Sequence, residues 1–131
     1  MNLTELQTLV DFVASTLGEK AKYKAVISSR LKRYSAVALI AKFLVSGRRT
    51  IKFSKSFINS YSSERITTTI IHEITHFKLA EKNRRILNRL KKGLFPYYPI
   101  KKEKWHSKRF YKRFEKLQTK FDNNFNQPIN E

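Results

Sequence analysis

The sequence predicts a single α+β domain in which three helices pack around a short sheet. In three separate segments apolar residues recur at spacings of three and four, which is the pattern of amphipathic helices. Stretches rich in β-branched residues lie between the first two of these segments and are typical of strands. The chain has 131 residues, of which 40% are hydrophobic, so it can bury one core. We expect the domain over residues 1–121 and a disordered, Asn-rich tail over residues 122–131.

The first helix is predicted over residues 2–17, with Asn2 or Thr4 as its N-cap and Gly18 at its end. Its apolar stripe consists of Leu3, Leu6, Val10, Val13 and Leu17. We expect this stripe to pack on the core.

An antiparallel sheet of about three strands is predicted after this helix. The strands are expected over residues 24–30, 35–45 and 50–54. A turn at Ser46 and Gly47 would join the last two strands as a hairpin. For residues 36–45 a helix is the alternative, because a short apolar run fits both structures.

The second helix is predicted from residue 64 to residue 81 or beyond, with Ser62 or Ser63 as its N-cap. Its apolar face carries Ile66, Ile70, Ile74 and Phe77. The opposite face carries Thr69, His72, Glu73 and His76. A third helix is predicted over residues 107–121, and its apolar positions are Phe110, Phe114, Leu117 and Phe121. An irregular loop with two prolines precedes it.

All three histidines of the chain fit one metal site. His72 and His76 are four residues apart on a helix, so both imidazoles project from the same side and can bind one ion. Glu73 is rotated by about 100° from His72, which leaves its carboxylate beside the ligands but outside the coordination shell. A carboxylate in that position suits a general base, which takes a proton from an activated water and returns it to the leaving amine. The sequence therefore predicts one Zn2+ per chain and Glu73 as the catalytic residue.

A catalytic zinc site needs a third protein ligand and one open position. We expect His106, at the start of the last predicted helix, to be that ligand. The acidic competitors are Glu81, Glu103 and Glu115. Glu81 is five residues past His76, and a straight helix cannot bring it back to the metal. Glu103 lies in a lysine cluster, and Glu115 follows nine residues after His106.

The formal net charge of +18 is extreme for this length. Residues 82–113 alone hold thirteen Lys or Arg against one Glu. Such a surface attracts polyanions through counterion release, which favours nucleic acid as a partner, with an anionic membrane second. Tyr97, Tyr98 or Trp105 would stack on exposed bases, or would pack their loop onto the body. The expected phosphate contacts are Arg84, Arg85, Arg89, Lys91, Lys92, Lys101, Lys102 and Lys104.

Other classes of protein are excluded by composition. The chain has no Cys, which excludes disulfides and Cys-based zinc fingers. Its first residues do not have the pattern of a secretory signal. The longest apolar stretch, residues 36–45, falls well short of the roughly 20 residues that cross a bilayer. We therefore expect a cytoplasmic monomer without a membrane partner, associated with DNA or the nucleoid if its charge serves that purpose.

Three segments together resemble the Spartan-type core of SprT-like metallopeptidases: residues 51–59, residues 63–71 and the string His72-Glu-Ile-Thr-His76. That family shows a strand ending in a serine and a helix with this string. Downstream it has a third zinc-binding histidine, followed by a small residue and then an aromatic. The segment His106-Ser-Lys-Arg-Phe110 matches, with Ser107 where glycine is more usual. The resemblance covers roughly residues 20–120.

The resemblance implies a small zincin-like domain that hydrolyses peptide bonds in proteins held on or near DNA, single-stranded DNA included. Two departures stand out. The 29 residues between His76 and His106 exceed the gap in many relatives, and the cysteine-bearing zinc ribbon of some members is absent. DNA contact would therefore come from the basic surface of the domain itself. Tyr98 and Tyr111 are candidates for stabilising an oxyanion, and spacing does not choose between them.

Two other functions remain open at this point. The His106 segment is also similar to YgjP-like metallopeptidases, in which a comparable string follows HExxH more closely. A zinc hydrolase of that type with a non-protein substrate is one alternative. The other is a non-catalytic, basic nucleic-acid-binding protein.

Overall fold

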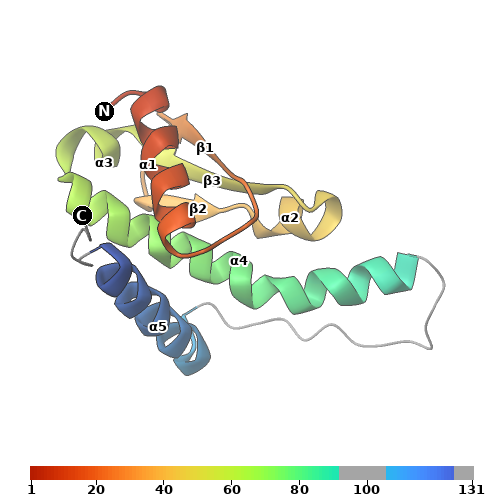
Figure 1. Cartoon of the computed structure of the whole chain (residues 1–131). Helices are drawn as coiled ribbons and strands as arrows, with labels where there is room; N and C mark the ends of the chain where they lie inside the picture. The colour runs from red at the N-terminus through yellow and green to blue at the C-terminus, as the bar shows by residue number, and fades with distance from the viewer. Residues whose placement is uncertain (92–105, 126–131) are drawn as a thin grey trace.

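The structure is a computed structural model that describes residues 1–91 and 106–125. Five helices and a three-stranded sheet make up this part of the chain, which confirms the predicted α+β class. In chain order the elements are α1 (Leu3–Thr16), β1 (Tyr23–Ser28), β2 (Ala36–Ala38), α2 (Ile40–Ser46), β3 (Arg49–Ser54), α3 (Lys55–Ser60), α4 (Ser63–Lys91) and α5 (Lys108–Phe125) (Figure 1).

The sheet has the strand order β1-β3-β2 and is mixed. β2 and β3 are antiparallel, as predicted, but β1 and β3 are parallel, so the prediction of an antiparallel sheet is wrong for that pair. A parallel pair needs a crossover between its strands. Here β2 and α2 provide it, since both lie between β1 and β3 in the chain.

The predicted strand over residues 35–45 and the hairpin after it are wrong for most of their length. Only Ala36–Ala38 is a strand, and Ile40–Ser46 is helix α2, the alternative that the pattern allowed. The helix includes Ala, Lys and Leu, which have good helix propensity. Gly47 then ends the helix at φ 77°, in the left-handed conformation that glycine adopts most easily.

One face of the sheet is covered by helices and forms the core. In register across the three strands, Ala25, Ile51 and Ala38 are buried side by side. The predicted apolar stripes of α1 and α4 pack over this face, and the most deeply buried residues of the two helices are Leu6, Val10, Val13, Ile66, Ile70, Ile74 and Phe77. Figure 1 shows α1 crossing the sheet and α4 running past it below. Because the apolar face of α4 packs on the core, the opposite face of this helix lies toward β2 and α5.

The helices differ from prediction mainly at their ends. Asn2 caps α1 with a capping box that includes Glu5. α3 was not predicted, and it begins where the Ser54 hydroxyl accepts a hydrogen bond from the Phe57 N–H. α5 continues to Phe125, into residues where a tail was expected. The predicted loop with Tyr97 and Tyr98 lies outside the described residues. Among the helices that are described, none combines the length and apolar character needed to cross a membrane.

Gly47→Ala is expected to lower the free energy of unfolding by about 2–3 kcal/mol, of which about 1 kcal/mol comes from the positive φ. A Cβ at Gly47 would lie 2.8 Å from Nη2 of Arg84. Arg84 cannot move away freely, because its Nη1 donates to the Leu44 carbonyl at 2.8 Å. Gly18→Ala is the matched control, since Gly18 has φ 75° but only Lys120 Nζ nearby, at 3.6 Å. Equal losses for the two variants in urea unfolding would contradict the role of Arg84.

Candidate metal centre

The three histidines of the chain come together at one point. α4 supplies His72 and His76 one turn apart, and His106 lies just before the first residue of α5. Nε2 of His72 lies 3.0 Å from Nε2 of His106. One ring nitrogen from each of the three side chains lies within 4.8 Å of the other two. Because α5 packs against α4, His106 lies beside His72 although it is 34 positions further along the chain.

His106 holds an unusual backbone conformation. Its φ is 56°, and no other non-glycine residue within residues 1–91 and 106–125 has a positive φ. Such a conformation costs free energy for a side chain with a Cβ and often marks a functional position. The start of α5 holds it in place, because the Ser107 hydroxyl accepts a hydrogen bond from the Phe110 N–H at 3.2 Å. The turn at His106 directs its ring back toward α4.

Phe110 forms an apolar floor beneath the histidines. Its ring centroid lies 4.8 Å from that of His72, 4.4 Å from that of His76 and 5.1 Å from that of His106. The side chain is 1% exposed. An apolar shell of this kind fixes the orientation of ligands and keeps water from one side of a metal site. The sequence predicted Phe110 as a core residue and as the aromatic that follows the third histidine in the family pattern, but it did not indicate contact with all three rings.

The donor set fits zinc. With Zn–N distances of about 2.0–2.1 Å, two nitrogens of a tetrahedral zinc site lie ~3.3 Å apart. The 3.0 Å between the Nε2 atoms of His72 and His106 is close to that value. Three imidazoles with one open position are a common ligand set for catalytic zinc. His72, His76 and His106 could therefore hold one metal ion.

Burial keeps two of the three histidines neutral. Loss of solvent, followed by the neighbouring His106, lowers the pKa of His72 to about 4. Loss of solvent, followed by His72 and His106, lowers the pKa of His76 to about 3. Metal binding requires unprotonated imidazoles. At neutral pH both side chains of α4 are thus ready to bind a metal without first losing a proton.

Glu73 lies beside the ligands and is nearly enclosed. One of its oxygens is 4.0 Å from Nε2 of His72, and the residue is only 5% exposed. Burial raises its pKa to about 8, and a hydrogen bond from the Ala38 backbone N–H opposes that rise. A cation nearby favours the ionised form of a carboxyl group and would lower this pKa. The sequence predicted Glu73 beside the two histidines of α4 but did not indicate its burial or its contact with β2.

Glu73 is expected to contribute less and less to the stability of the metal-free protein as pH rises from about 4.5 to 8. In that range folded Glu73 holds a proton that the unfolded chain has released, so its contribution to the free energy of unfolding falls with pH, by up to about 1.4 kcal/mol per unit. Glu73→Gln removes this slope. After chelation of metal, urea unfolding of both proteins across this range measures the difference. The lowered pKa values of His72 and His76 destabilise both proteins below pH 6.5 and cancel in the comparison. Identical pH profiles would contradict the raised pKa of Glu73.

The histidines open into a cleft of about 1080 Å3. One wall is the outward face of α4, with Arg65, Thr68 and Thr69 one and two turns before His72. The other wall is β2 and the residues leading into it. The cleft therefore lies between α4 and β2, the edge strand of the sheet.

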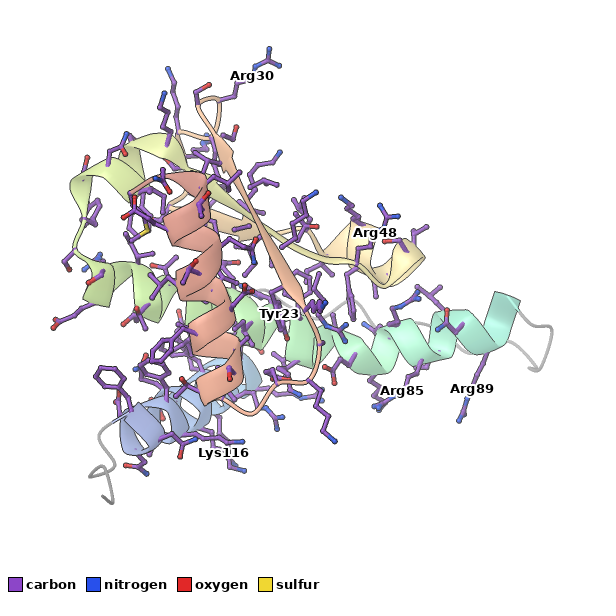
Figure 2. All side chains as sticks on the ribbon, turned by 45° about the horizontal axis from the view of Figure 1, so that its top comes forward. Tyr23, Arg30, Arg48, Arg85, Arg89 and Lys116 are labelled. Atoms are coloured by element: carbon purple, nitrogen blue, oxygen red, sulfur yellow. The ribbon has the colours of Figure 1, made fainter. Side chains whose placement is uncertain are left out.

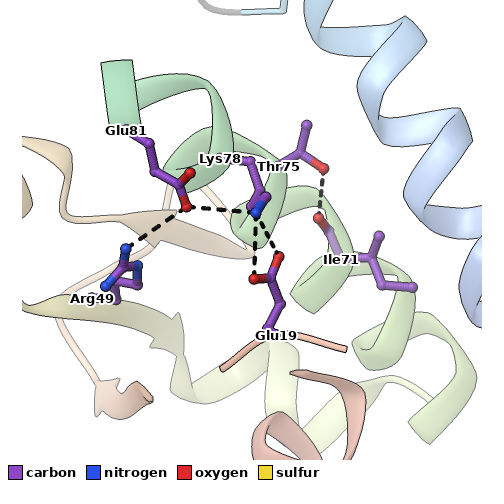
Figure 3. Close-up of polar contacts among 6 residues, drawn as sticks. All are labelled: Glu19, Arg49, Ile71, Thr75, Lys78 and Glu81. Atoms are coloured by element: carbon purple, nitrogen blue, oxygen red, sulfur yellow. Dashed lines mark hydrogen bonds and ion pairs between the residues drawn. The ribbon is translucent and has the colours of Figure 1, made fainter. Parts of the chain in front are cut away.

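The competing ligand Glu81 is engaged elsewhere. Its Oε1 lies 3.6 Å from Lys78 Nζ and 3.7 Å from Arg49 Nη2, and Lys78 also pairs with Glu19 at 3.3 Å (Figure 3). These ion pairs tie α4 to β3 and to the loop after α1. Glu115 is exposed on α5 and is not part of the metal-ligand group. Glu103 lies outside the described residues.

The expected phosphate contacts are only partly described. Arg84 is partly buried and donates to the Leu44 carbonyl, so it also supports the end of α2. Arg85 and Arg89 are exposed on the second half of α4 (Figure 2). Lys91 ends that helix. Lys92, Lys101, Lys102 and Lys104 lie outside the described residues.

Comparison with known proteins identifies the family. A model described as the SprT-like family matches residues 5–89. No curated protein and no solved structure gives a match. The match includes His72, Glu73 and His76 and ends before His106, so the third histidine joins the site on geometry alone. Because the match spans more than half of the sequence, the chain belongs to the SprT-like family.

Proposed function

We propose that the protein is a zinc-dependent metallopeptidase that hydrolyses peptide bonds in proteins associated with nucleic acid. The observation that carries the proposal is the convergence of three histidines around one point, with the Glu73 carboxylate beside them at the base of a cleft. Membership of the SprT-like family supports the same reaction.

His72, His76 and His106 would hold the metal. When bound, zinc lowers the pKa of water and polarises a carbonyl group. Glu73 takes a proton from the attacking water at its carboxylate and returns it to the leaving amine. The Ala38 N–H holds this carboxylate in place, and the surrounding apolar residues limit access of bulk water.

The open edge of β2 supports an extended peptide as the substrate. Ser54 N–H donates to the Ser35 carbonyl, and Leu39 N–H donates to the Thr50 carbonyl, so the backbone groups of residues 35 and 39 face β3. Alternate residues of a strand direct these groups to opposite edges. Those of Ala36 and Ala38 therefore face the cleft. The Ala38 N–H is bound to Glu73, and an extended chain can pair with both backbone groups of Ala36 and with the Ala38 carbonyl as an added strand. A substrate without a peptide backbone cannot pair with this edge as an added strand.

The link to nucleic acid rests on charge. A net charge of +18 on 131 residues attracts polyanions. Exposed Arg85 and Arg89 extend this charge along α4 beyond the sheet. We include the remaining expected contacts, which are Arg84, Lys91, Lys92, Lys101, Lys102 and Lys104, in the proposal.

A substrate panel tests the proposed function. Unfolded protein, short peptides, nucleotides and phosphoesters are incubated with the zinc-loaded protein, with and without single-stranded DNA. We expect cleavage of protein and peptide only, loss of cleavage with a chelator, and recovery when zinc is restored. Hydrolysis confined to a non-peptide substrate would replace the peptidase with another zinc hydrolase. Zinc binding without any hydrolysis would leave a nucleic-acid-binding protein.

A further inference from the structure

The outer face of α5 carries an uninterrupted row of like charges. Lys108, Lys112 and Lys116 follow one another at spacings of four residues, and Arg113 lies next to the row. All four are exposed, and no ion pair within residues 1–91 and 106–125 involves them. Figure 2 shows Lys116 projecting from α5 away from the sheet. The row is about 12 Å long, which is enough to follow about three phosphates of a nucleic-acid strand.

The positive charges of this row lower the stability of α5. Cations four residues apart repel one another, at a cost of about 0.2–0.5 kcal/mol per pair. Lys108 and Arg109 also occupy the first turn, where the helix dipole favours acidic residues, and none is present there. Glu115 is the one acidic residue between Lys108 and Lys120. A bound polyanion would relieve both the mutual repulsion and the conflict with the dipole.

We propose that this face of α5, made of Lys108, Lys112, Arg113, Lys116 and the ring of Tyr111, binds single-stranded nucleic acid next to the metal centre. Tyr111 is 52% exposed and lies beside the lysine row. Its ring centroid is 6.2 Å from that of His106. An exposed aromatic beside a basic track is the arrangement that stacks unpaired bases. A strand held here passes directly beside the third metal ligand.

A membrane surface fits this face less well. A helix that lies on a bilayer needs its apolar face free to enter the lipid. In α5 that face is already used, because Phe110, Leu117 and Phe121 are buried against the rest of the domain.

A second basic surface of the described chain is a large hollow, in which acidic residues partly neutralise the positive charge. It has a volume of about 790 Å3 and is lined by Lys20, Lys22, Lys24, Lys42, Arg48 and Arg49. Asp11 and Glu19 line the same hollow. Arg49 already pairs with Glu81, and Glu19 with Lys78. On the face of α5, Glu115 is the one acidic residue against four basic side chains, and no ion pair within residues 1–91 and 106–125 joins it to them.

Two quadruple variants with the same change in charge test the proposal. One replaces Lys108, Lys112, Arg113 and Lys116 by Gln, and the matched control replaces Lys20, Lys22, Lys24 and Lys42 by Gln. The probe is a short fluorescent single-stranded oligonucleotide, titrated at several salt concentrations. We expect the α5 variant to bind at least about tenfold more weakly and to lower the salt slope of log K by about three. The control should stay within about threefold of wild type. Unchanged zinc content and melting temperature exclude misfolding.

Tyr111→Ala tests the stacking contact. We expect it to weaken binding of the single strand by about fivefold or more, and to have little effect on the duplex of the same sequence. Tyr34→Ala is the matched control, because Tyr34 is also exposed and follows Lys32 and Arg33. Equal losses for Tyr34→Ala and Tyr111→Ala would overturn the assignment of the base contact to α5.

Several results would overturn the proposal as a whole. These are equal weakening by the two quadruple variants, wild-type affinity of the α5 variant, and binding of anionic phosphatidylserine vesicles with no binding of the oligonucleotide. The inference rests on the nucleic-acid link of the proposed function and not on peptide hydrolysis. If wild type binds no oligonucleotide, that link fails together with the inference, whereas the substrate panel still decides the peptidase. If wild type binds but not through α5, only the inference fails.

Discussion

Glu73→Gln is expected to abolish peptide hydrolysis while leaving the zinc in place. The amide keeps the size of the side chain and can still accept the hydrogen bond from the Ala38 N–H, but it cannot take a proton from water. General-base catalysis is typically worth 10²–10⁴-fold, so cleavage should fall by at least about a hundredfold. Because the carboxylate is not one of the three ligand groups, metal content should match wild type. Turnover of a peptide substrate and zinc content are measured on the same preparation.

Glu64→Gln is the matched control for this variant. Glu64 lies on the same helix and lines the same cleft, but it is exposed and stands before the histidines. We expect it to keep at least about half of the wild-type rate, as surface substitutions usually have small effects. Wild-type cleavage by Glu73→Gln would remove Glu73 from the mechanism. Loss of zinc in that variant would instead make Glu73 a ligand.

His106→Ala is expected to weaken zinc binding by about 10–100-fold or more, since it removes one of three protein ligands and second-shell changes alone cost that much. His106→Asn should have a similar effect. Asn tolerates positive φ better than Ala, so it preserves the turn at φ 56° and separates loss of the ligand from loss of the turn. Competition with a chromophoric chelator measures the affinity.

Glu115→Ala provides the comparison within α5. Glu115 is the competing carboxylate on that helix, and its exposed position outside the ligand group predicts wild-type zinc affinity. A loss with Glu115→Ala and none with His106→Ala would exchange the two assignments.

The helix that carries the candidate site could be predicted because its signals are local. The spacing of His72 and His76 and the buried stripe opposite them depend only on the helical repeat. His106 could be named because the chain has only three histidines, but its closeness to His72 depends on the packing of α5 on α4. The contact between Glu73 and Ala38 has no local signal, because it joins a helix to an edge strand 35 positions earlier in the sequence.

The sheet was predicted less well, because strand pairing depends on contacts between distant segments and has no local signal. Strand direction depends on which segments cross between strands, and the apolar run of residues 36–45 was compatible with strand or helix. Its division into β2 and α2 follows from tertiary packing, since Phe43 of α2 is buried against Phe77 of α4. Because β2 is an edge strand of the sheet, its outer edge lines the cleft beside the three histidines.

The zinc content of the purified wild-type protein decides whether the three histidines bind one metal ion. The protein is equilibrated with excess zinc, freed of unbound metal by gel filtration and analysed by mass spectrometry for zinc and protein together. We predict one zinc per chain, with the ion removed by a chelator and regained on addition of zinc. If the wild-type protein is folded and retains no zinc after this treatment, then His72, His76 and His106 do not form a zinc site.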